Sequence, residues 1–161
     1  MLKRSFPPVV DARTRLLLLG SLPGEQSLAR GRYYAHPRNQ FWRLVGGVIG
    51  RDVEALDYEE RLKALLGAGV GLWDVVGSAT RAGSLDTNIR GHSANPLADL
   101  AASLPQLKAV GFNGGTSARL GAPLLAADPR LTLLPLPSSS PAYTRPFAEK
   151  LERWMALRAF L

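Results

Sequence analysis

Four short apolar runs, separated by amphipathic segments, most constrain how this chain can fold. The runs are rich in Leu and Val, and most are bounded by glycine, proline or polar residues, as buried strands are. They are Arg15–Gly20, Gly71–Val76, Leu107–Phe112 and Leu131–Leu136. Strands that alternate with helices pair in parallel through helical crossovers. The chain is therefore predicted to form an α/β fold with a four-stranded, mostly parallel sheet and helices on both faces.

Amphipathic segments between and after these runs are predicted to be helices. In the last of them Phe147, Leu151 and Trp154 recur at helical spacing, which gives one apolar face. The lead-in, residues 1–14, is expected to be loose. No repeat or linker divides the chain, so a single domain over residues 1–161 is expected. The predicted helices are Asn39–Ile49, Tyr58–Leu66, Pro96–Ser103, Thr116–Ala126 and Arg145–Phe160.

Glycine-rich or polar segments follow every predicted strand. In open α/β sheets the carboxyl ends of parallel strands share one edge, and ligands bind just beyond it. The loop Gly83–His92 follows the second strand and therefore starts at this edge as well. The other segments are Gly20–Gly24, Asp74, Asn113–Gly115 and Pro137–Pro141. We expect all of them to converge on one ligand site.

The residue types that the chain lacks exclude several kinds of chemistry. Without cysteine there are no disulfides, no thiolate-ligated iron–sulfur clusters and no Cys-type zinc sites. His36 and His92 are the two histidines, and no HExxH spacing exists, so we expect neither a metal nor a cofactor. No apolar run is long enough for a membrane span or a signal peptide, so a cytoplasmic protein is expected.

The charge distribution favours a polyanionic partner. The net charge is +7 and the pI is about 10.4, as is common for domains that bind nucleic acids. A composition rich in Ala, Leu, Gly and Arg also arises from a GC-rich genome, so charge alone does not decide. The acids collect between Asp52 and Glu60, away from a group of arginines. A phosphate-binding face opposite an acidic face would produce this separation. The grouped arginines are Arg30, Arg32, Arg38 and Arg43.

The segment Arg32–Arg43, Arg-Tyr-Tyr-Ala-His-Pro-Arg-Asn-Gln-Phe-Trp-Arg, concentrates aromatic and basic side chains at the start of a predicted helix. Aromatic rings stack on bases, and arginine pairs with phosphates. This combination indicates a site that holds a flat, anionic ligand, and nucleic acid meets both conditions.

Each of the smaller clusters has a structural and a functional interpretation. The turn Gly20–Ser27 is either an ordinary strand-to-helix turn, with Ser27 as a helix cap, or a binding site for a phosphate or a base carbonyl. Ser138–Pro141 can cap the last helix or hold phosphates. Asp74 can cap a loop or orient a water or a base. Asn113 can form a turn or read a base edge.

Three further observations limit the chemistry that these clusters can perform. Asp86 and Asn88 are expected to form local turn bonds. A serine nucleophile is not expected, because no Gly-x-Ser-x-Gly elbow is present. A Schiff-base nucleophile is not expected either, because none of the four lysines falls in the clusters. These lysines are Lys3, Lys63, Lys108 and Lys150.

Three segments, taken in order, resemble the uracil-DNA glycosylase superfamily: Gly20–Ser27, Tyr33–Trp42 with its His-Pro-x-Asn-x-Phe-Trp string, and Leu136–Tyr143. Gly71-Leu-Trp-Asp-Val-Val, Gly83-Ser-Leu-Asp-x-Asn-Ile and the Leu-Pro-Ser-x-Ser-Pro string are most similar to the hypoxanthine branch. The mismatch-specific uracil branch comes next. The resemblance implies a three-layer α/β/α sandwich around a four-stranded parallel sheet.

One departure from the family pattern bears on the substrate. Relatives carry Asp or Asn in the first motif to position the attacking water, and Leu22 stands at that place here. The hypoxanthine branch shares this lack and is thought to rely on the asparagine of the His-Pro-x-Asn string, here Asn39. The second-motif position held by His or Asn elsewhere is Ser138. These changes favour a deaminated purine over uracil.

The resemblance then assigns roles to individual residues. Asn39 and Ser138 are the expected catalytic residues, with Asn39 orienting a water. Tyr34 would stack on the flipped base, and the segment Pro141–Tyr143 would wedge into the duplex. The expected base-binding residues are Ser21, Leu22, Pro23, Gly24, Tyr34, His36 and Asn113. The expected DNA-binding residues are Ser139, Ser140, Pro141, Ala142, Tyr143, Arg38 and Arg145.

The predicted activity is that of a monofunctional, monomeric DNA glycosylase. It would flip hypoxanthine out of double-stranded DNA and excise it hydrolytically, without cofactor or metal. Two alternatives remain: a mismatch-specific uracil or thymine glycosylase, and a catalytically silent DNA-binding module. A small-molecule α/β enzyme is disfavoured, since neither GxGxxG nor GxxxxGK[ST] occurs.

Overall fold

The computed structural model describes residues 2–161, and its centre is a four-stranded parallel sheet in the order β3-β2-β6-β7. The strands are β2 (Leu16–Gly20), β3 (Val70–Asp74), β6 (Ala109–Asn113) and β7 (Thr132–Leu136). Leu16 pairs with Val70 on one side and with Ala109 on the other, and every pairing in this sheet is parallel. The predicted fold class is confirmed.

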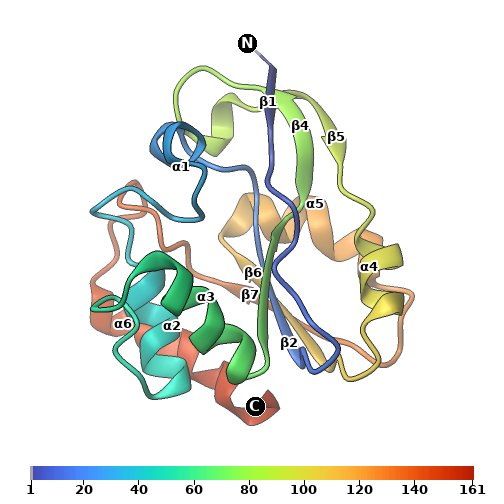
Figure 1. The fold of residues 1–161 in the computed structure, drawn as a ribbon. Helices are drawn as coiled ribbons and strands as arrows, with labels where there is room; N and C mark the ends of the chain where they lie inside the picture. The colour runs from blue at the N-terminus through green and yellow to red at the C-terminus, as the bar shows by residue number, and fades with distance from the viewer. Residues whose placement is uncertain (1) are drawn as a thin grey trace.

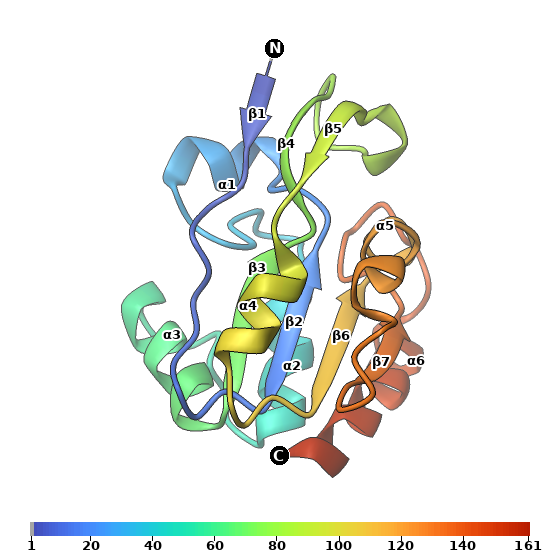
Figure 2. The ribbon, with the colours of Figure 1, turned by 90° about the vertical axis from the view of Figure 1, so that its right-hand side faces the viewer.

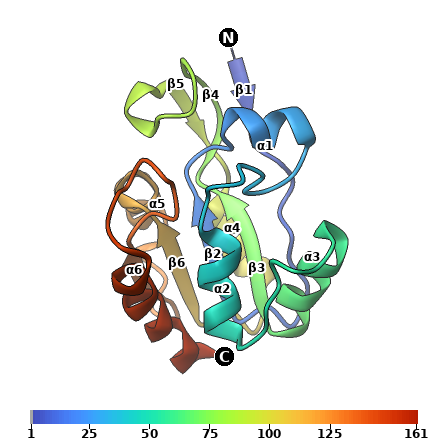
Figure 3. The ribbon, with the colours of Figure 1, turned by 90° about the vertical axis from the view of Figure 1, so that its left-hand side faces the viewer.

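The residues of β2 show how the two faces of the sheet are covered. Leu16 and Leu18 pack into a cluster with α2 (Phe41–Ile49), α3 (Tyr58–Gly67) and α6 (Phe147–Trp154). Leu17 and Leu19 pack on the opposite face, with α4 (Leu97–Ser103) and α5 (Gly115–Leu125). Because successive side chains of a strand point to opposite faces, a run that is apolar at every position needs a helix layer on each side. Figures 2 and 3 show the two helix layers in turn.

A second, three-stranded antiparallel sheet was not predicted. Its order is β1-β4-β5, formed by β1 (Leu2–Arg4), β4 (Val76–Thr80) and β5 (Arg90–Ala94). It lies beyond the carboxyl ends of the parallel strands, beside α1 (Glu25–Arg30), in the upper part of Figure 1. The predicted lead-in was therefore wrong for residues 2–4, while Met1 lies outside the described residues. Three residues are too few for a pattern, and β5 is exposed throughout, so it lacks alternation.

The predicted strand Gly71–Val76 is divided between the two sheets. Its first part belongs to β3, and Val76 begins β4. Across the junction the Val75 N–H donates to the Gly20 carbonyl at 2.8 Å and the Val76 N–H to the Ser21 carbonyl at 2.9 Å. The chain therefore stays bonded to the end of β2 as it leaves the parallel sheet. In Figure 3, β3 leads upward to β4, so the second sheet lies directly beyond the ligand edge.

The structure differs from two of the predicted segments in secondary structure. The loop Gly83–His92 contains a 3₁₀ turn, η1 (Asp86–Asn88), and the start of β5. The predicted helix Arg145–Phe160 is α-helical only over α6 and continues as the 3₁₀ segment η2 (Met155–Phe160). Ser27 lies inside α1 and is not its cap, because Gly24 holds that position. The Ser27 hydroxyl instead accepts the Ala35 N–H at 3.0 Å.

Candidate active site

The segments predicted to converge do so around one cavity of about 580 Å³ at the carboxyl edge of the parallel sheet. The cavity receives residues from the ends of β2, β3 and β6, from the loop after β7, and from the loop between β4 and β5. Its volume falls within the usual range of small-molecule sites. Of the predicted site residues, the following line it: Ser21, Leu22, Pro23, Gly24, Tyr34, His36, Asn39, Asn113, Ser138, Ser139, Ser140, Pro141, Ala142 and Tyr143.

Two predicted DNA-contacting arginines lie outside this lining. Arg38 and Arg145 are exposed, and Arg145 pairs with Glu149 at 3.7 Å. Two of the grouped arginines stack on aromatic rings of the protein itself, since Arg43 lies 4.0 Å from the Phe147 ring centre and Arg32 lies 5.3 Å from that of Tyr58. Part of the basic charge thus packs against the protein's own surface, although both arginines remain exposed.

Tyr34 sits in a constrained loop with one ring face covered. Its φ of 52° lies in the left-handed region that residues other than glycine rarely adopt. The Trp42 indole N–H donates to the Tyr34 carbonyl at 3.2 Å and helps to hold this conformation. The Tyr34 ring stacks on Phe41 at 3.9 Å with an interplanar angle of 9°. Since a ring has two faces and Tyr34 also lines the cavity, it can offer the second face to a flat ligand.

A buried arginine, Arg81, stabilises the turn Gly20–Gly24. Arg81 donates to the carbonyls of Leu22 and Pro23, and burial lowers its pKa. The Leu22 side chain packs with Val76 and Ala79 in a small apolar cluster. The turn therefore supplies no polar side chain at position 22. The carbonyls of Leu22 and Pro23 already accept hydrogen bonds from Arg81.

Ion pairs and hydrogen bonds tie the loop after β4 to this turn. Ser21 donates its hydroxyl to Asp86 at 2.7 Å, and Asp86 also lies 3.8 Å from Arg81. The Glu25 N–H donates to the Ser84 hydroxyl at 2.9 Å. Lys3 pairs with Glu25 and donates to the Gly83 carbonyl at 2.6 Å. Asp86 forms the expected local turn bond, since its carbonyl accepts the Ile89 N–H at 3.1 Å, but its carboxylate also binds Ser21 in a distant part of the chain, which was not predicted.

Asn39 lies just before α2, at the rim of the cavity. Its Oδ1 accepts the Phe41 N–H at 2.9 Å, an Asx turn that fixes the side chain at the helix start. A carbonyl oxygen has two lone pairs, so Oδ1 can accept one more hydrogen bond. His36 is engaged locally, since its Nδ1 accepts the Arg38 N–H at 3.0 Å.

Asn113 and Ser139 bind each other inside the protein. Asn113 Nδ2 donates to the Ser139 hydroxyl at 2.9 Å, and the Ser139 N–H donates to Asn113 Oδ1 at 2.9 Å. Both residues are buried. This reciprocal pair attaches the loop after β7 to the end of β6. The geometry gives Asn113 and Ser139 a structural role beside the predicted contacts to base and DNA.

The loop Ser138–Tyr143 is stabilised by its own hydroxyls and by a buried lysine. Ser138 Oγ accepts the Ser140 N–H, and Ser140 Oγ accepts the Ala142 N–H, both at 3.1 Å. Lys150, only 1% exposed, donates to the Ser140 carbonyl at 3.3 Å and lies 5.4 Å from the Tyr143 ring centre. All four lysines lie outside these clusters in the sequence, but the fold brings Lys150 and Lys3 into contact with them, and neither lysine lines the cavity.

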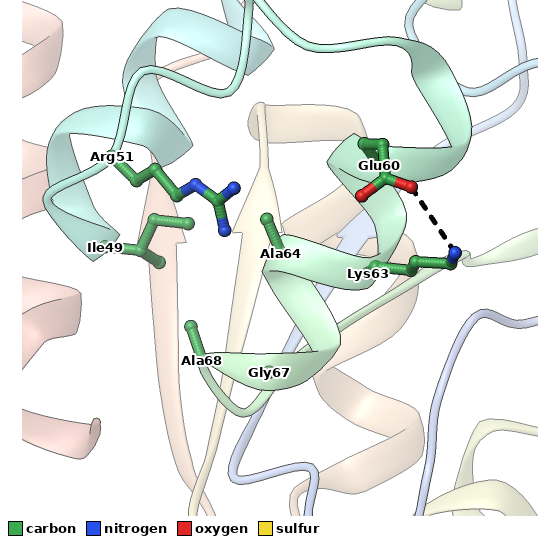
Figure 4. Close-up of a pocket in the computed structure, with 7 residues that line it drawn as sticks. All are labelled: Ile49, Arg51, Glu60, Lys63, Ala64, Gly67 and Ala68. Carbon is green, nitrogen blue, oxygen red and sulfur yellow. Dashed lines mark hydrogen bonds and ion pairs between the residues drawn. The ribbon is translucent and has the colours of Figure 1, made fainter.

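A second hollow, of about 400 Å³, lies between the end of α2 and α3, as Figure 4 shows. It contains none of the predicted site residues. The Lys63–Glu60 pair drawn there is 3.4 Å long and exposed, and such pairs contribute little. Within residues 2–161, no group of His, Cys, Asp and Glu side chains is arranged to hold a metal ion. In the same part of the chain, no helix combines the length and apolarity that crossing a bilayer requires.

The fold and cavity define an α/β/α protein with an aromatic and amide-lined ligand site at the carboxyl edge of its sheet. The chain belongs to the uracil DNA glycosylase superfamily, whose family model matches residues 7–158. The family expected from the sequence motifs is thereby confirmed.

Relatives and a solved structure agree with this assignment over nearly the whole chain. A protein of Methanosarcina barkeri named hypoxanthine DNA glycosylase is 42% identical over 154 residues, 96% of each chain. A protein of the same name from Methanosarcina acetivorans is 40% identical over 157 residues, 98% of each chain. A solution NMR structure from Methanosarcina acetivorans, described as a candidate uracil DNA glycosylase, is 38% identical and covers 99% of both chains, with a TM-score of 0.89.

Proposed function

We propose that this protein is a monofunctional DNA glycosylase that excises hypoxanthine from deoxyinosine in double-stranded DNA. Membership of the superfamily supports glycosylase activity, and the two relatives named hypoxanthine DNA glycosylase support the choice of base. The observation that carries the proposal is that the Gly20–Gly24 turn, Tyr34, Asn39 and the loop after β7 line one cavity. We further propose that it acts as a cytoplasmic monomer with a single domain.

In this mechanism the cavity receives a base that has left the helical stack. Flipping costs a few kcal/mol and is easiest for a weakened pair, such as one containing a deaminated base. Tyr34 stacks on the base, while the exposed Pro141, Ala142 and Tyr143 enter the gap in the duplex. Arg38 and Arg145 contact the phosphates. The base-contacting surface includes the backbone of the Gly20–Gly24 turn.

The chemical step is hydrolysis with an oxocarbenium-like transition state. Asn39 orients the water through Oδ1 and stabilises developing charge, since its amide does not titrate near neutral pH. Ser138, the second proposed catalytic residue, lines the cavity, and a Cβ added to Gly114 would lie 3.1 Å from the Ser138 Cβ. No lysine is among the described residues that line the cavity, which supports hydrolysis over a Schiff-base reaction. Because Leu22 is buried among apolar side chains, the turn does not take over the role of Asn39.

The direct test is single-turnover cleavage of duplexes that carry one hypoxanthine, uracil, xanthine or mismatched thymine. Alkali then reveals the abasic sites. We expect release of hypoxanthine with little release of uracil. Strong uracil excision without hypoxanthine release would assign the protein to the mismatch branch. Binding without release of any base would leave a DNA-binding module.

Replacing Gly20 with alanine should block the cavity. A Cβ at this position would lie 2.5 Å from Asp74 Oδ1 and 2.9 Å from the Tyr34 hydroxyl oxygen, distances too short for carbon. We expect the single-turnover rate on deoxyinosine to fall by at least about tenfold, as misplacement by about 1 Å can cost more than that. The control is Gly67→Ala at the end of α3, outside the cavity lining, where a Cβ meets nothing within 4 Å. Equal rates for the two variants would contradict the proposed position of the base.

Replacing Tyr34 with alanine should weaken capture of the flipped base. Stacking of a base on an aromatic ring contributes about 1–3 kcal/mol. We expect a corresponding loss in affinity for a duplex with a non-cleavable deoxyinosine analogue, measured by fluorescence anisotropy. Tyr34→Phe should restore most of it, because the ring is retained. Thermal melts of both variants separate this effect from loss of the Phe41 stack. If alanine and phenylalanine bind equally, Tyr34 does not stack on the base.

A further inference from the structure

Asp74 is a buried carboxyl group in the cavity with an unused oxygen. It ends β3, pairs in register with Gly20 on β2, and is only 3% exposed. Among the described residues, its Oδ2 and the Tyr34 hydroxyl are buried without any hydrogen-bond partner. Both side chains line the cavity and approach the same side of Gly20. Buried polar groups are nearly always paired, so two unpaired groups facing one cavity indicate that a ligand completes them.

The surroundings of Asp74 place its pKa near neutral pH, so that a large share of the carboxyl groups carries a proton there. Burial, the negative charge of Asp86 and the opposing charge of Arg81 together raise the pKa of Asp74 to about 7, with burial as the main cause. Arg81 is already engaged with three backbone carbonyls, including that of Gly83. The remaining titratable neighbours are the phenols of Tyr33 and Tyr34, whose pKa values are raised chiefly by burial, so both stay neutral.

We propose, on the basis of the function proposed above, that Asp74 is a catalytic acid that protonates the O6/N7 edge of hypoxanthine as the glycosidic bond breaks. O6 and N7 of a 6-oxopurine are both acceptors on the same edge, so one carboxyl O–H can serve this edge.

The step balances without any further reactant. The bond between C1′ and N9 breaks, and its electron pair remains on the purine. The carboxyl proton of Asp74 moves to N7, so hypoxanthine leaves as a neutral molecule and Asp74 becomes a carboxylate. The water held by Asn39 adds to C1′ and releases one proton, which restores the carboxyl group. The net reaction is addition of water across the glycosidic bond.

The first experiment compares Asp74→Asn with the wild-type protein in single-turnover excision of deoxyinosine from about pH 5 to about pH 9. Asparagine preserves the shape and can donate a hydrogen bond but cannot transfer a proton. General acids contribute about 10²–10⁴-fold, so we expect a loss of at least about 100-fold below pH 7. The wild-type rate should fall as the pH rises through about 7, because Asp74 then loses its proton, and the variant should lack this fall.

The second experiment removes the acceptor from the substrate. In 7-deazadeoxyinosine a carbon replaces N7, so the wild-type protein should lose most of its rate, and Asp74→Asn should lose little more. The ratio of the wild-type rate on deoxyinosine to the wild-type rate on 7-deazadeoxyinosine should also decrease with rising pH. This test needs no variant. Thermal melting reports whether Asp74→Asn folds. Above pH 7 the melting temperature of this variant should exceed that of the wild type, because the wild-type protein then buries the charged Asp74 carboxylate.

The outcomes separate this inference from the proposed function. If the wild-type protein releases no hypoxanthine, the proposed function fails. If it releases hypoxanthine, but Asp74→Asn stays within about threefold of its rate and follows the same pH profile, Asp74 is not the acid. A pH-independent ratio between the two substrates overturns the proposal in the same way.

Discussion

Asn39→Ala is expected to lower hypoxanthine excision by about 10²–10³-fold, the usual effect of losing one preorganised polar group that stabilises a transition state. The structure gives the reason. Asn39 lies at the cavity rim, fixed by the 2.9 Å bond from the Phe41 N–H. Alanine leaves the reacting water without an acceptor in a preset position. The measurement is the single-turnover rate on a deoxyinosine duplex with enzyme in excess.

Controls for Asn39 must separate chemistry from folding and binding. Alanine also removes the Asx turn, so Asn39→Ser is a useful second variant: its hydroxyl can accept the Phe41 N–H but is shorter than the amide. Both variants should bind a duplex with a non-cleavable analogue as the wild type does. Gln106→Ala removes an exposed side-chain amide outside the cavity lining and should keep full activity. A rate for Asn39→Ala within about threefold of the wild type would remove Asn39 from the mechanism.

Trp154→Ala should destabilise the protein by about 3–5 kcal/mol, as truncation of large buried aromatic residues does. Trp154 is fully buried on α6 and meets Phe41 edge-on, with ring centres 5.9 Å apart. Its indole N–H also donates to the Pro137 carbonyl at 2.9 Å. The substitution therefore opens a cavity next to α2 and releases the loop after β7. Urea unfolding followed by circular dichroism measures the loss.

Two variants locate the origin of this effect. Trp154→Phe retains most of the ring but loses the bond to Pro137, so it should cost less than alanine and still disturb the loop. Arg153→Ala, at the exposed neighbouring position, should change the free energy of unfolding by no more than about 0.5 kcal/mol. A loss below about 1 kcal/mol for Trp154→Ala would mean that α6 contributes little to the core.

The parallel sheet could be predicted because its signals are local. Leu16–Leu19 is apolar at every position, which requires cover on both faces, and the structure provides helices on each. Asn39 could be selected only with the help of the family resemblance, since an asparagine before a helix is common. The second sheet carries no such local signal: β1 has three residues, and β5 is exposed at every position.

The residues that hold the site in place could not be predicted from the sequence either, because their partners lie far away in the chain. Asp86 and Arg81 were visible in the sequence as charges in or beside a loop, but their partners Ser21, Leu22 and Pro23 lie in the turn after β2. A signal was present in the opposite charges of Arg81 and Asp86. Nothing in the local pattern connects either residue with the turn. The buried position of Lys150 beneath Ser140 was likewise not visible in the sequence.

By itself, the sequence determined the alternation of strands and helices, the edge where the ligand site lies, and the motif residues that identify the family. These properties depend on periodicity and on residues close together in the chain. Only the tertiary structure decided the sheet order β3-β2-β6-β7, the clamp of Arg81 and Asp86 on the Gly20–Gly24 turn, and the burial of Asp74 against Gly20. These depend on pairing between distant segments, and the raised pKa of Asp74 follows from the burial that this pairing produces.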